Sequence, residues 1–322
     1  MRRDLVNKQS LALAIVVCLF MIATPPGRAA GKDGGREVAI TFDDLPATHG
    51  DLQKMTAITR KLLGKIAANG VPAIGFVNEG KVNVGGEEAA RASLLRMWLD
   101  GGIELGNHTY SHVSIDRAPL AEYESDVIRG EAVIKRLLGE RGMKLRYFRH
   151  PQLRTGPTPE YKAALDRFLA ARGYRVAPVT IDNNDYLFAD AYARAKERGD
   201  AETVKRVADA YIPYMEKIFD FFERLSVEAV GYEVRQTLLL HANELNADYF
   251  DDLVQMMKRR GYKFISLDDA LRDKAYALPD AQVKTGLSWI HRWMIAKGMT
   301  VRREPREPEF IAKLFETRSD RR

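Results

Sequence analysis

The chain has 322 residues, of which 46% are hydrophobic and 29% are charged. This length accommodates one large domain or two small ones, and the balance of apolar and charged residues excludes wholesale disorder. The net charge of +6 gives no case for a nucleic-acid partner, because the basic excess lies at the two ends of the chain.

The first 30 residues have the pattern of a signal peptide. Basic residues precede a run of 13 apolar residues, 11–23, which is followed by two prolines and by Ala29 and Ala30. This run is short for a membrane span but suits a signal-peptide core. We expect residues 1–30 to direct export to the periplasm, the cell envelope or the medium, with an uncleaved anchor as the alternative. After their removal the chain would have no stable membrane span and, since Cys18 lies in the leader, no cysteine.

Short β-rich runs alternate with amphipathic stretches along the rest of the chain. Seven strands are expected, at 37–42, 72–77, 102–105, 146–148, 175–181, 236–240 and 263–266. Apolar residues at three- and four-residue spacing predict helices at 51–68, 87–99, 120–139, 159–172 and 249–260. Repeated strand–helix units indicate a parallel sheet covered by helices, so we predict an α/β fold over 36–275, a distorted (β/α)7 TIM-like barrel. An open doubly wound sheet is the alternative.

Two segments depart from this alternation. Residues 188–230 are rich in Ala, Lys, Arg and Glu and contain a group of aromatic residues, which predicts a helical insertion whose aromatic side chains form core. Residues 276–322 form a basic tail with a plausible helix around Trp289 and Trp293. A solvated surface is the expected environment of this tail, and the sequence assigns it no function.

Ionisable side chains collect where the predicted strands end. In a parallel βα barrel all strand C-termini open on one face, so side chains from distant parts of the sequence converge there. The residues in question are Asp43, Asp44, His108, His112, Arg149, Asp182, Asp185 and His241. We therefore expect one polar site at the mouth of the barrel.

The residue types at this mouth favour a metal site. His108 and His112 are four residues apart, which places both imidazoles on one side of a helical turn or tight loop. One carboxylate and two neutral imidazoles suit zinc, with cobalt or nickel as alternatives, better than calcium or magnesium. Each pattern alone has an ordinary explanation, since paired aspartates are common in solvated turns. Their conjunction at successive strand ends indicates one divalent ion.

These motifs resemble those of the polysaccharide deacetylases with a NodB homology domain, carbohydrate esterase family four. The likeness covers roughly 37–271, and its motifs occur in the family's usual order. The first two motifs, Thr41-Phe42-Asp43-Asp44 and His108-Thr109-Tyr110-Ser111-His112, are the most specific. The other three are Arg149-His150-Pro151, Asp182-Asn183-Asn184-Asp185-Tyr186 and Leu239-Leu240-His241.

The resemblance implies a role for each polar residue of the site. Asp44, His108 and His112 would hold the ion. Asp43 would be the general base, and Arg149 would keep it ionised and oriented, since a nearby cation lowers the pKa of a carboxyl group.

The resemblance also implies an acid and a substrate site. His241 would be the general acid, with Asp185 tuning its imidazole, and the backbone N–H of Gln152 would help to stabilise the oxyanion. Gln152, Tyr186 and Leu239 would contact the sugar. Leu45, Gln152 and Tyr186 depart from the usual Gly, aromatic residue and Trp of the family. Because such positions line the sugar groove in relatives, these departures affect substrate identity rather than chemistry.

The sequence thus predicts an exported hydrolase that removes N-acetyl groups from an N-acetylglucosamine-containing glycan, such as peptidoglycan, a chitin-type oligomer or poly-N-acetylglucosamine. O-acetyl ester hydrolysis by the same residues is one alternative, and a catalytically silent glycan-binding protein is another. Asp43 and His241 argue against the silent protein, because binding alone requires neither. His49 and His150 are expected to lie at the surface or behind the site.

Overall fold

The computed structural model describes residues 35–316. The proposed signal peptide, 1–30, lies outside these residues. Within them, seven strands form one sheet, and every pairing is parallel. The strands are β1 (Arg36–Leu45), β2 (Ala73–Val77), β3 (Glu104–Asn107), β4 (Tyr147–Phe148), β5 (Arg175–Val176), β6 (Gln236–His241) and β7 (Tyr262–Phe264). No described helix is long and apolar enough to cross a bilayer.

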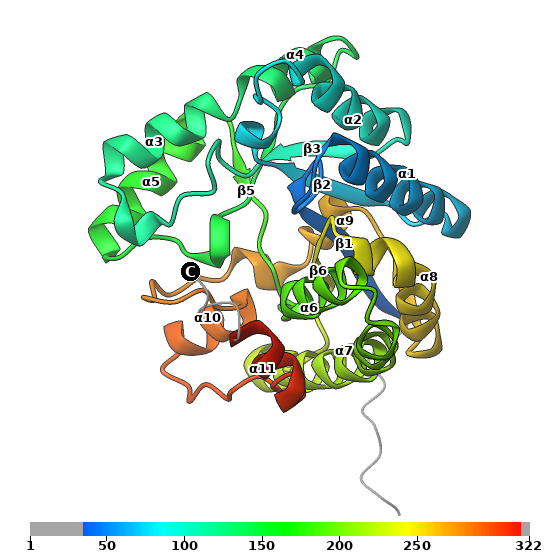
Figure 1. Ribbon diagram of the computed structural model, residues 1–322. Helices are drawn as coiled ribbons and strands as arrows, with labels where there is room; N and C mark the ends of the chain where they lie inside the picture. Colours follow the sequence, from blue (N-terminus) through cyan, green and yellow to red (C-terminus); the bar gives the residue numbers. More distant parts are fainter. Residues whose placement is uncertain (1–34, 317–322) are drawn as a thin grey trace, which may run out of the picture. The chain divides into compact units, whose positions relative to one another are not determined.

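The sheet curls round and its two ends approach each other. Its strand order is β5-β4-β3-β2-β1-β6, with β7 paired to β1. The chain beyond β5 then returns to the other end of the sheet, where Ile181 bridges to Leu238 of β6. This bridge favours the barrel over the open doubly wound sheet. The predicted α/β fold, a distorted (β/α) barrel, is confirmed, and Figure 1 shows its strands surrounded by helices.

The helices follow their strands as the sequence pattern predicted, except that the helix expected at 249–260 begins at Glu244 and the one expected at 120–139 is divided. The helices of the barrel are α1 (Leu52–Asn69), α2 (Glu88–Asp100), α3 (Leu120–Arg129), α4 (Ala132–Gly139), α5 (Pro159–Ala171), α8 (Glu244–Arg259) and α9 (Leu267–Ala270). The single helix expected at 120–139 is wrong, because α3 and α4 are separate. Gly130 lies between them, where a Cβ atom would stand 2.8 Å from the backbone carbon of Thr109. The break therefore lets the loop after β3 pack against the chain at Gly130.

The inserted segment forms two helices, α6 (Asp185–Glu197) and α7 (Ala201–Val230). Its aromatic residues Tyr211, Tyr214, Phe219 and Phe222 are buried, which agrees with a role in the core. The insertion begins earlier than expected, because Asp185 is itself the first residue of α6. A residue of the proposed site thus lies at the start of the inserted pair.

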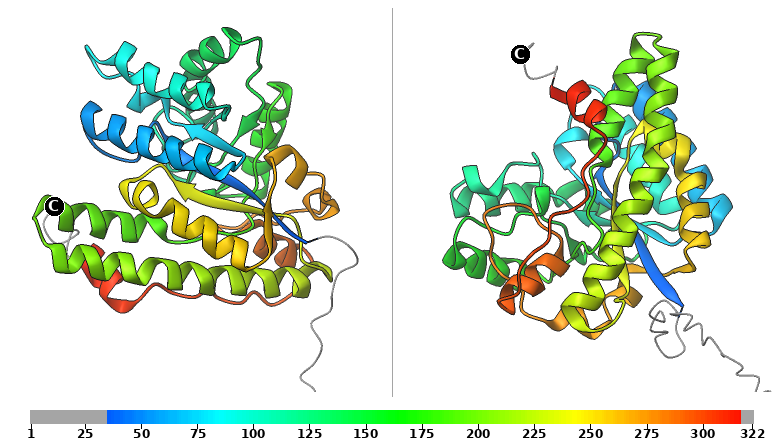
Figure 2. Two further views of the ribbon diagram at one scale, coloured as in Figure 1. Left: turned by 90° about the vertical axis from the view of Figure 1, so that its right-hand side faces the viewer. Right: turned by 90° about the horizontal axis from the view of Figure 1, so that it is seen from below.

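The C-terminal segment is folded against the rest of the described chain rather than solvated along its length. Its helices are α10 (Trp289–Ala296) and α11 (Glu309–Glu316). Helix α10 contacts α7, and α11 contacts α6 (Figure 1, orange and red). In the two views of Figure 2, α11 lies alongside the inserted helices. The expectation of a solvated tail is therefore wrong for α10, whose Trp289, Trp293 and Met294 are buried.

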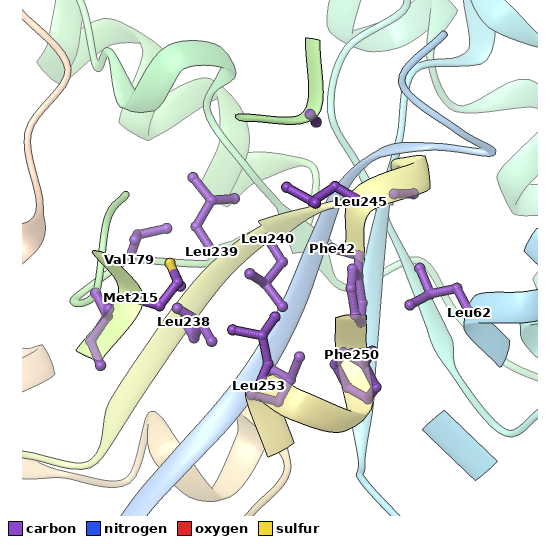
Figure 3. Packing of buried hydrophobic residues seen from close by; sticks show 14 of the residues in the cluster. Phe42, Leu62, Val179, Met215, Leu238, Leu239, Leu240, Leu245, Phe250 and Leu253 are labelled. Carbon is purple, nitrogen blue, oxygen red and sulfur yellow. The ribbon is translucent and has the colours of Figure 1, made fainter. Parts of the chain in front are cut away.

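The core of the sheet is apolar and continuous with the surrounding helices. Phe42 of β1 packs against Trp98 of α2 and Phe250 of α8, with ring centroids 5.6 and 5.8 Å apart. Leu238 and Leu240 of β6 lie beside this group (Figure 3). Burial of these side chains fixes β1, and hence the position of the aspartates at its end.

We expect Phe250→Ala to lower the free energy of unfolding by about 3–5 kcal/mol, because it removes a fully buried ring between α8 and β1. Ile128→Ala is the matched control, since this side chain on α3 is 45% exposed and its loss should cost less than about 1 kcal/mol. Urea unfolding followed by circular dichroism measures both. Equal losses in the two variants would contradict the packing described here.

Candidate active site

The two aspartates occupy an irregular end of β1. Pairing with β2 passes from Phe42 opposite Gly75 to Leu45 opposite Val77, so β1 has one residue more than β2 in this interval. Asp44 lies in this bulge with a φ of 69°. A bulge re-aims the side chains beside it, which explains how two neighbouring carboxylates of one strand both line the same cavity.

The two predicted imidazole ligands come from the tight loop after β3. His108 is buried, and its Nδ1 lies 2.9 Å from the carbonyl oxygen of Arg149. If Nδ1 carries the proton and donates it to this carbonyl, Nε2 keeps its lone pair for an ion. Further along the loop, Thr109 and His112 have φ values of 66° and 56°. The backbone N–H of His112 donates to Thr109 Oγ1, which stabilises this turn.

Asp44, His108 and His112 come together as a potential ion site. One ligand atom of each lies within 4.8 Å of the others, and Asp44 Oδ1 stands 3.8 Å from His112 Nε2. Asp44 Oδ1 is buried without a hydrogen-bond partner. Burial lowers the pKa of both histidines, which keeps the imidazoles neutral as ligation requires. The donor set therefore fits a divalent ion of the zinc type.

Lys81 is a residue of this site that the sequence gave no reason to select. Its Nζ lies 3.4 Å from Asp44 Oδ1 and also donates to the carbonyl oxygen of Asp44. Burial alone would raise the pKa of Asp44, but Lys81 and then His112 hold this pKa well below its usual range. The ligand carboxylate is thus ionised before any ion binds. Only the fold shows this, because Lys81 follows β2 and belongs to none of the motifs.

Asp43 lies between Arg149 and the ion site. Arg149 is fully buried, with Nη1 3.7 Å from Asp43 Oδ2 and Nη2 donating to Thr41 Oγ1. Arg149 was expected to keep Asp43 ionised, and it does lower the pKa of this carboxyl group. Burial has the larger effect, however, and raises the pKa of Asp43 to about 6. A carboxylate with a pKa near neutrality is suited to accept a proton from water.

His241 and Asp185 form a close pair at the end of β6. His241 Nδ1 lies 2.6 Å from Asp185 Oδ1, and the backbone N–H of His241 donates to the other oxygen of this carboxylate. Asn246 also donates to Asp185. Burial would lower the pKa of His241, but Asp185 outweighs it and raises this pKa to about 9. His241 is therefore a protonated donor at neutral pH.

Asp43, Asp44, His108, His112 and His241 line one cavity of about 900 Å³. Lys81, Arg149 and Asp185 contact Asp44, Asp43 and His241 from outside its lining. The predicted sugar contacts Gln152, Tyr186 and Leu239 line the cavity, as does His49. Asp182 also lines it, and burial raises the pKa of this carboxyl group to about 6. His150 does not reach this cavity. It is buried and borders a separate cavity of about 290 Å³.

One wall of the main cavity comes from the C-terminal segment, which the sequence analysis left without a role. The contributing residues are Thr285, Gly286, Leu287, His291, Val301, Arg302, Arg303 and Glu304. Within them, His291 Nδ1 lies 3.4 Å from Glu304 Oε1. Burial, with a contribution from Asp182, raises the pKa of Glu304 to about 8. The sequence offered no signal for this wall, because no motif or periodicity connects 285–304 to the strand ends.

A family model described as polysaccharide deacetylase matches residues 30–176. This segment is therefore similar to the polysaccharide deacetylase family. A curated relative, a peptidoglycan-N-acetylglucosamine deacetylase of Bacillus cereus, is 34% identical over 111 residues. That match covers 34% of this chain and 35% of the relative, so the chain spans about a third of the length of this curated protein. The resemblance inferred from the motifs is confirmed.

Solved structures of family members are similar to the described chain at low identity. A chitin deacetylase from the fungal pathogen Colletotrichum lindemuthianum is 21% identical, with a TM-score of 0.48 over 72% of this chain and 86% of that one. A carbohydrate esterase family 4 pseudoenzyme from Bacillus anthracis is 14% identical, with a TM-score of 0.45 over 73% and 65% of the two chains.

We expect Asp44→Asn to abolish binding of a divalent ion, because it removes the only charged ligand among the three residues that converge. Asp43→Asn is the matched control at the neighbouring position, and it should keep the ion while losing turnover. The zinc content of each purified variant, measured by mass spectrometry beside acetate release, tests both. An Asp44→Asn protein with a full complement of zinc would contradict the ligand assignment.

Proposed function

We propose that this protein is a metal-dependent deacetylase that hydrolyses N-acetyl groups of an N-acetylglucosamine-containing glycan. The observation that carries the proposal is the cavity itself. Three convergent ion ligands, a carboxyl group with a pKa of about 6 and an imidazole with a pKa of about 9 all line it. Two titrating groups whose surroundings separate their pKa values on either side of neutrality suit a base and an acid.

The residues divide the hydrolysis among them. When bound by Asp44, His108 and His112, the ion supplies polarisation of the acetyl carbonyl and acidification of a water molecule. Asp43 accepts a proton from the attacking water, with Arg149 beside it. The backbone N–H of Gln152 donates to the developing oxyanion. His241 then donates its proton to the sugar nitrogen as the carbon–nitrogen bond breaks, which releases acetate and a free amine.

The substrate is proposed at the level of the acetylated glycan. Peptidoglycan is the substrate in the printed name of the curated relative, whereas a chitin deacetylase is among the similar structures. A cavity of about 900 Å³ is at the upper end of the usual range for ligand sites. We also propose export through residues 1–30, which would bring the protein to a glycan outside the membrane. These features support peptidoglycan, chitin-type oligomers and poly-N-acetylglucosamine alike.

The decisive experiment is an acetate-release panel. The chain without its first 30 residues, supplied with zinc, cobalt or nickel, should release acetate from N-acetylated oligosaccharides and leave one free amine for each acetate. Acetate from acetylated xylan without amine formation would instead show an O-acetyl esterase. Binding of glycan without acetate release from any substrate would show a silent relative, as in the pseudoenzyme among the similar structures.

The same two pKa values predict a bell-shaped dependence of kcat/KM on pH. Activity should fall as pH drops through the pKa of Asp43, about 6, because the base becomes protonated. It should fall again as pH rises through the pKa of His241, about 9, because the acid loses its proton. A bound cation shifts both limbs to lower pH.

Asp185→Asn isolates the alkaline limb of this profile. It should move that limb to lower pH, since it removes the carboxylate that stabilises the imidazolium. Asp166→Asn on α5 is a control of the same chemistry outside the cavity, and it should leave both limbs in place. An alkaline limb that does not move in Asp185→Asn would exclude His241 as the acid.

A further inference from the structure

The C-terminal segment contacts the loop that carries Gln152. This loop, Pro151–Leu153, follows β4 and forms a short helical turn. Gln152 and Leu153 have φ values of 56° and 54°, so two consecutive residues with side chains adopt the left-handed conformation. Such a conformation persists only where surrounding contacts impose it. Besides the hydrogen bonds of the turn itself, Gly286 and Arg292 of the C-terminal segment contact these two residues.

Arg292 of α10 links this loop to the C-terminal segment through its guanidinium group. Its Nη2 donates to the carbonyl oxygen of Leu153 at 2.6 Å, and Nη1 donates to Thr155 Oγ1 at 3.0 Å. The remaining bonds go to the carbonyl oxygens of Ala281 and Leu287. Arg292 is fully buried, and burial lowers its pKa to about 10, which leaves it charged at neutral pH. A planar fork with several donors makes all these bonds at once, and an ammonium group does not.

Gly286 brings the backbone of the C-terminal segment directly against Gln152. A Cβ atom at this position would stand 2.0 Å from the carbonyl oxygen of Gln152 and 3.2 Å from its carbonyl carbon. Both are backbone atoms, so no side-chain rotation relieves the overlap. Glycine is the residue that permits such close approach of two backbones. Any side chain at 286 therefore displaces the peptide group that joins Gln152 to Leu153, and with it the left-handed backbone of Gln152 that sets the direction of its N–H.

The same segment is fixed to the barrel on its other side. The backbone N–H of Trp289 donates to the carbonyl oxygen of Val179 at 2.7 Å, and Ser288 Oγ donates to the carbonyl oxygen of Thr180 at 2.8 Å. These two acceptors precede Ile181, which bridges to β6. Residues 286–292 thus connect the loop of Gln152 to residues 179–181, which pair with β6, the strand that ends at His241.

We infer that Gly286 and Arg292 are positioning residues that place the backbone N–H of Gln152 for the acetyl oxyanion. The inference rests on the proposed function and adds an element to it, because both residues lie beyond the segment, 30–176, that the family model matches. The C-terminal segment is then part of the catalytic apparatus of this chain rather than an appendage. Its contribution is to kcat, since an oxyanion donor acts on the transition state and not on the bound sugar.

Gly286→Ala tests this directly, with Gly85→Ala as the matched control. A Cβ atom at Gly85 meets nothing within 4 Å, so the control should keep wild-type kcat. Gly286→Ala should lose about 10²-fold in kcat with KM and zinc content within about twofold of wild type, because the donor is displaced and the ion site is not. Arg292→Lys should show the same pattern with a smaller loss, and it decides the question should Gly286→Ala not fold.

A second substrate distinguishes positioning from general damage. An N-trifluoroacetyl sugar forms a more stable oxyanion, so the loss of kcat in both variants should be smaller with it than with the N-acetyl sugar. Equal losses on both substrates, or wild-type kcat in folded Gly286→Ala and Arg292→Lys, would overturn the inference alone. If the unaltered chain releases no acetate from either substrate, the proposed function fails as well.

Discussion

Two neighbouring carboxylates buried at the end of one strand constrain the rest of this site. Burial raises the cost of ionising both Asp43 and Asp44, and Asp44 adds to that of Asp43, so each requires a cation beside it. Arg149, directly after β4, lies beside Asp43, and Lys81, in the turn after β2, lies beside Asp44. The unequal outcome separates their roles. Asp44 is firmly ionised and suits an ion ligand, whereas Asp43 titrates near neutrality and suits a base.

Left-handed backbone conformations, which are unfavourable for residues with a side chain, are concentrated around this cavity. Among the described residues, those other than glycine with positive φ are Asp44, Thr109, His112, Gln152 and Leu153. Asp44 lies in the bulge of β1 and the others in the loops that follow β3 and β4, and all but Thr109 line the cavity. Strain of this kind is retained where packing over-determines it and the resulting placement is useful. Here it places two of the proposed ion ligands, Asp44 and His112, and the proposed oxyanion donor Gln152 around one cavity.

The proposed acid is built by a different route from the proposed base. His241 ends β6 with regular strand pairing, and its partner Asp185 begins α6 of the inserted pair. Asn246 of α8 completes the set of bonds to this carboxylate. The inserted pair therefore supplies Asp185, which raises the pKa of the His241 imidazole. The C-terminal segment, which lies outside the matched residues 30–176, supplies one wall of the cavity. Both segments therefore contribute residues to the cavity or to the side chains that line it.

The sequence by itself determined the fold class, because hydrophobic periodicity is a local property of each segment. It also indicated which motif residues lie near one another, because the C-terminal ends of parallel barrel strands share one face. It predicted seven candidates. In the structure, Asp43, Asp44, His108, His112 and His241 line a single cavity, and Arg149 and Asp185 contact Asp43 and His241 from behind. The sequence could not determine the break at Gly130, the place of Lys81 or the wall formed by 285–304. Each of these depends on a close approach between segments far apart in the chain, and such an approach leaves no periodic or spacing signal in either segment alone. The pKa values also depended on the tertiary structure, because burial is a property of the folded molecule. At Asp43 the effect of burial on the pKa outweighed that of Arg149, which the sequence had suggested would dominate.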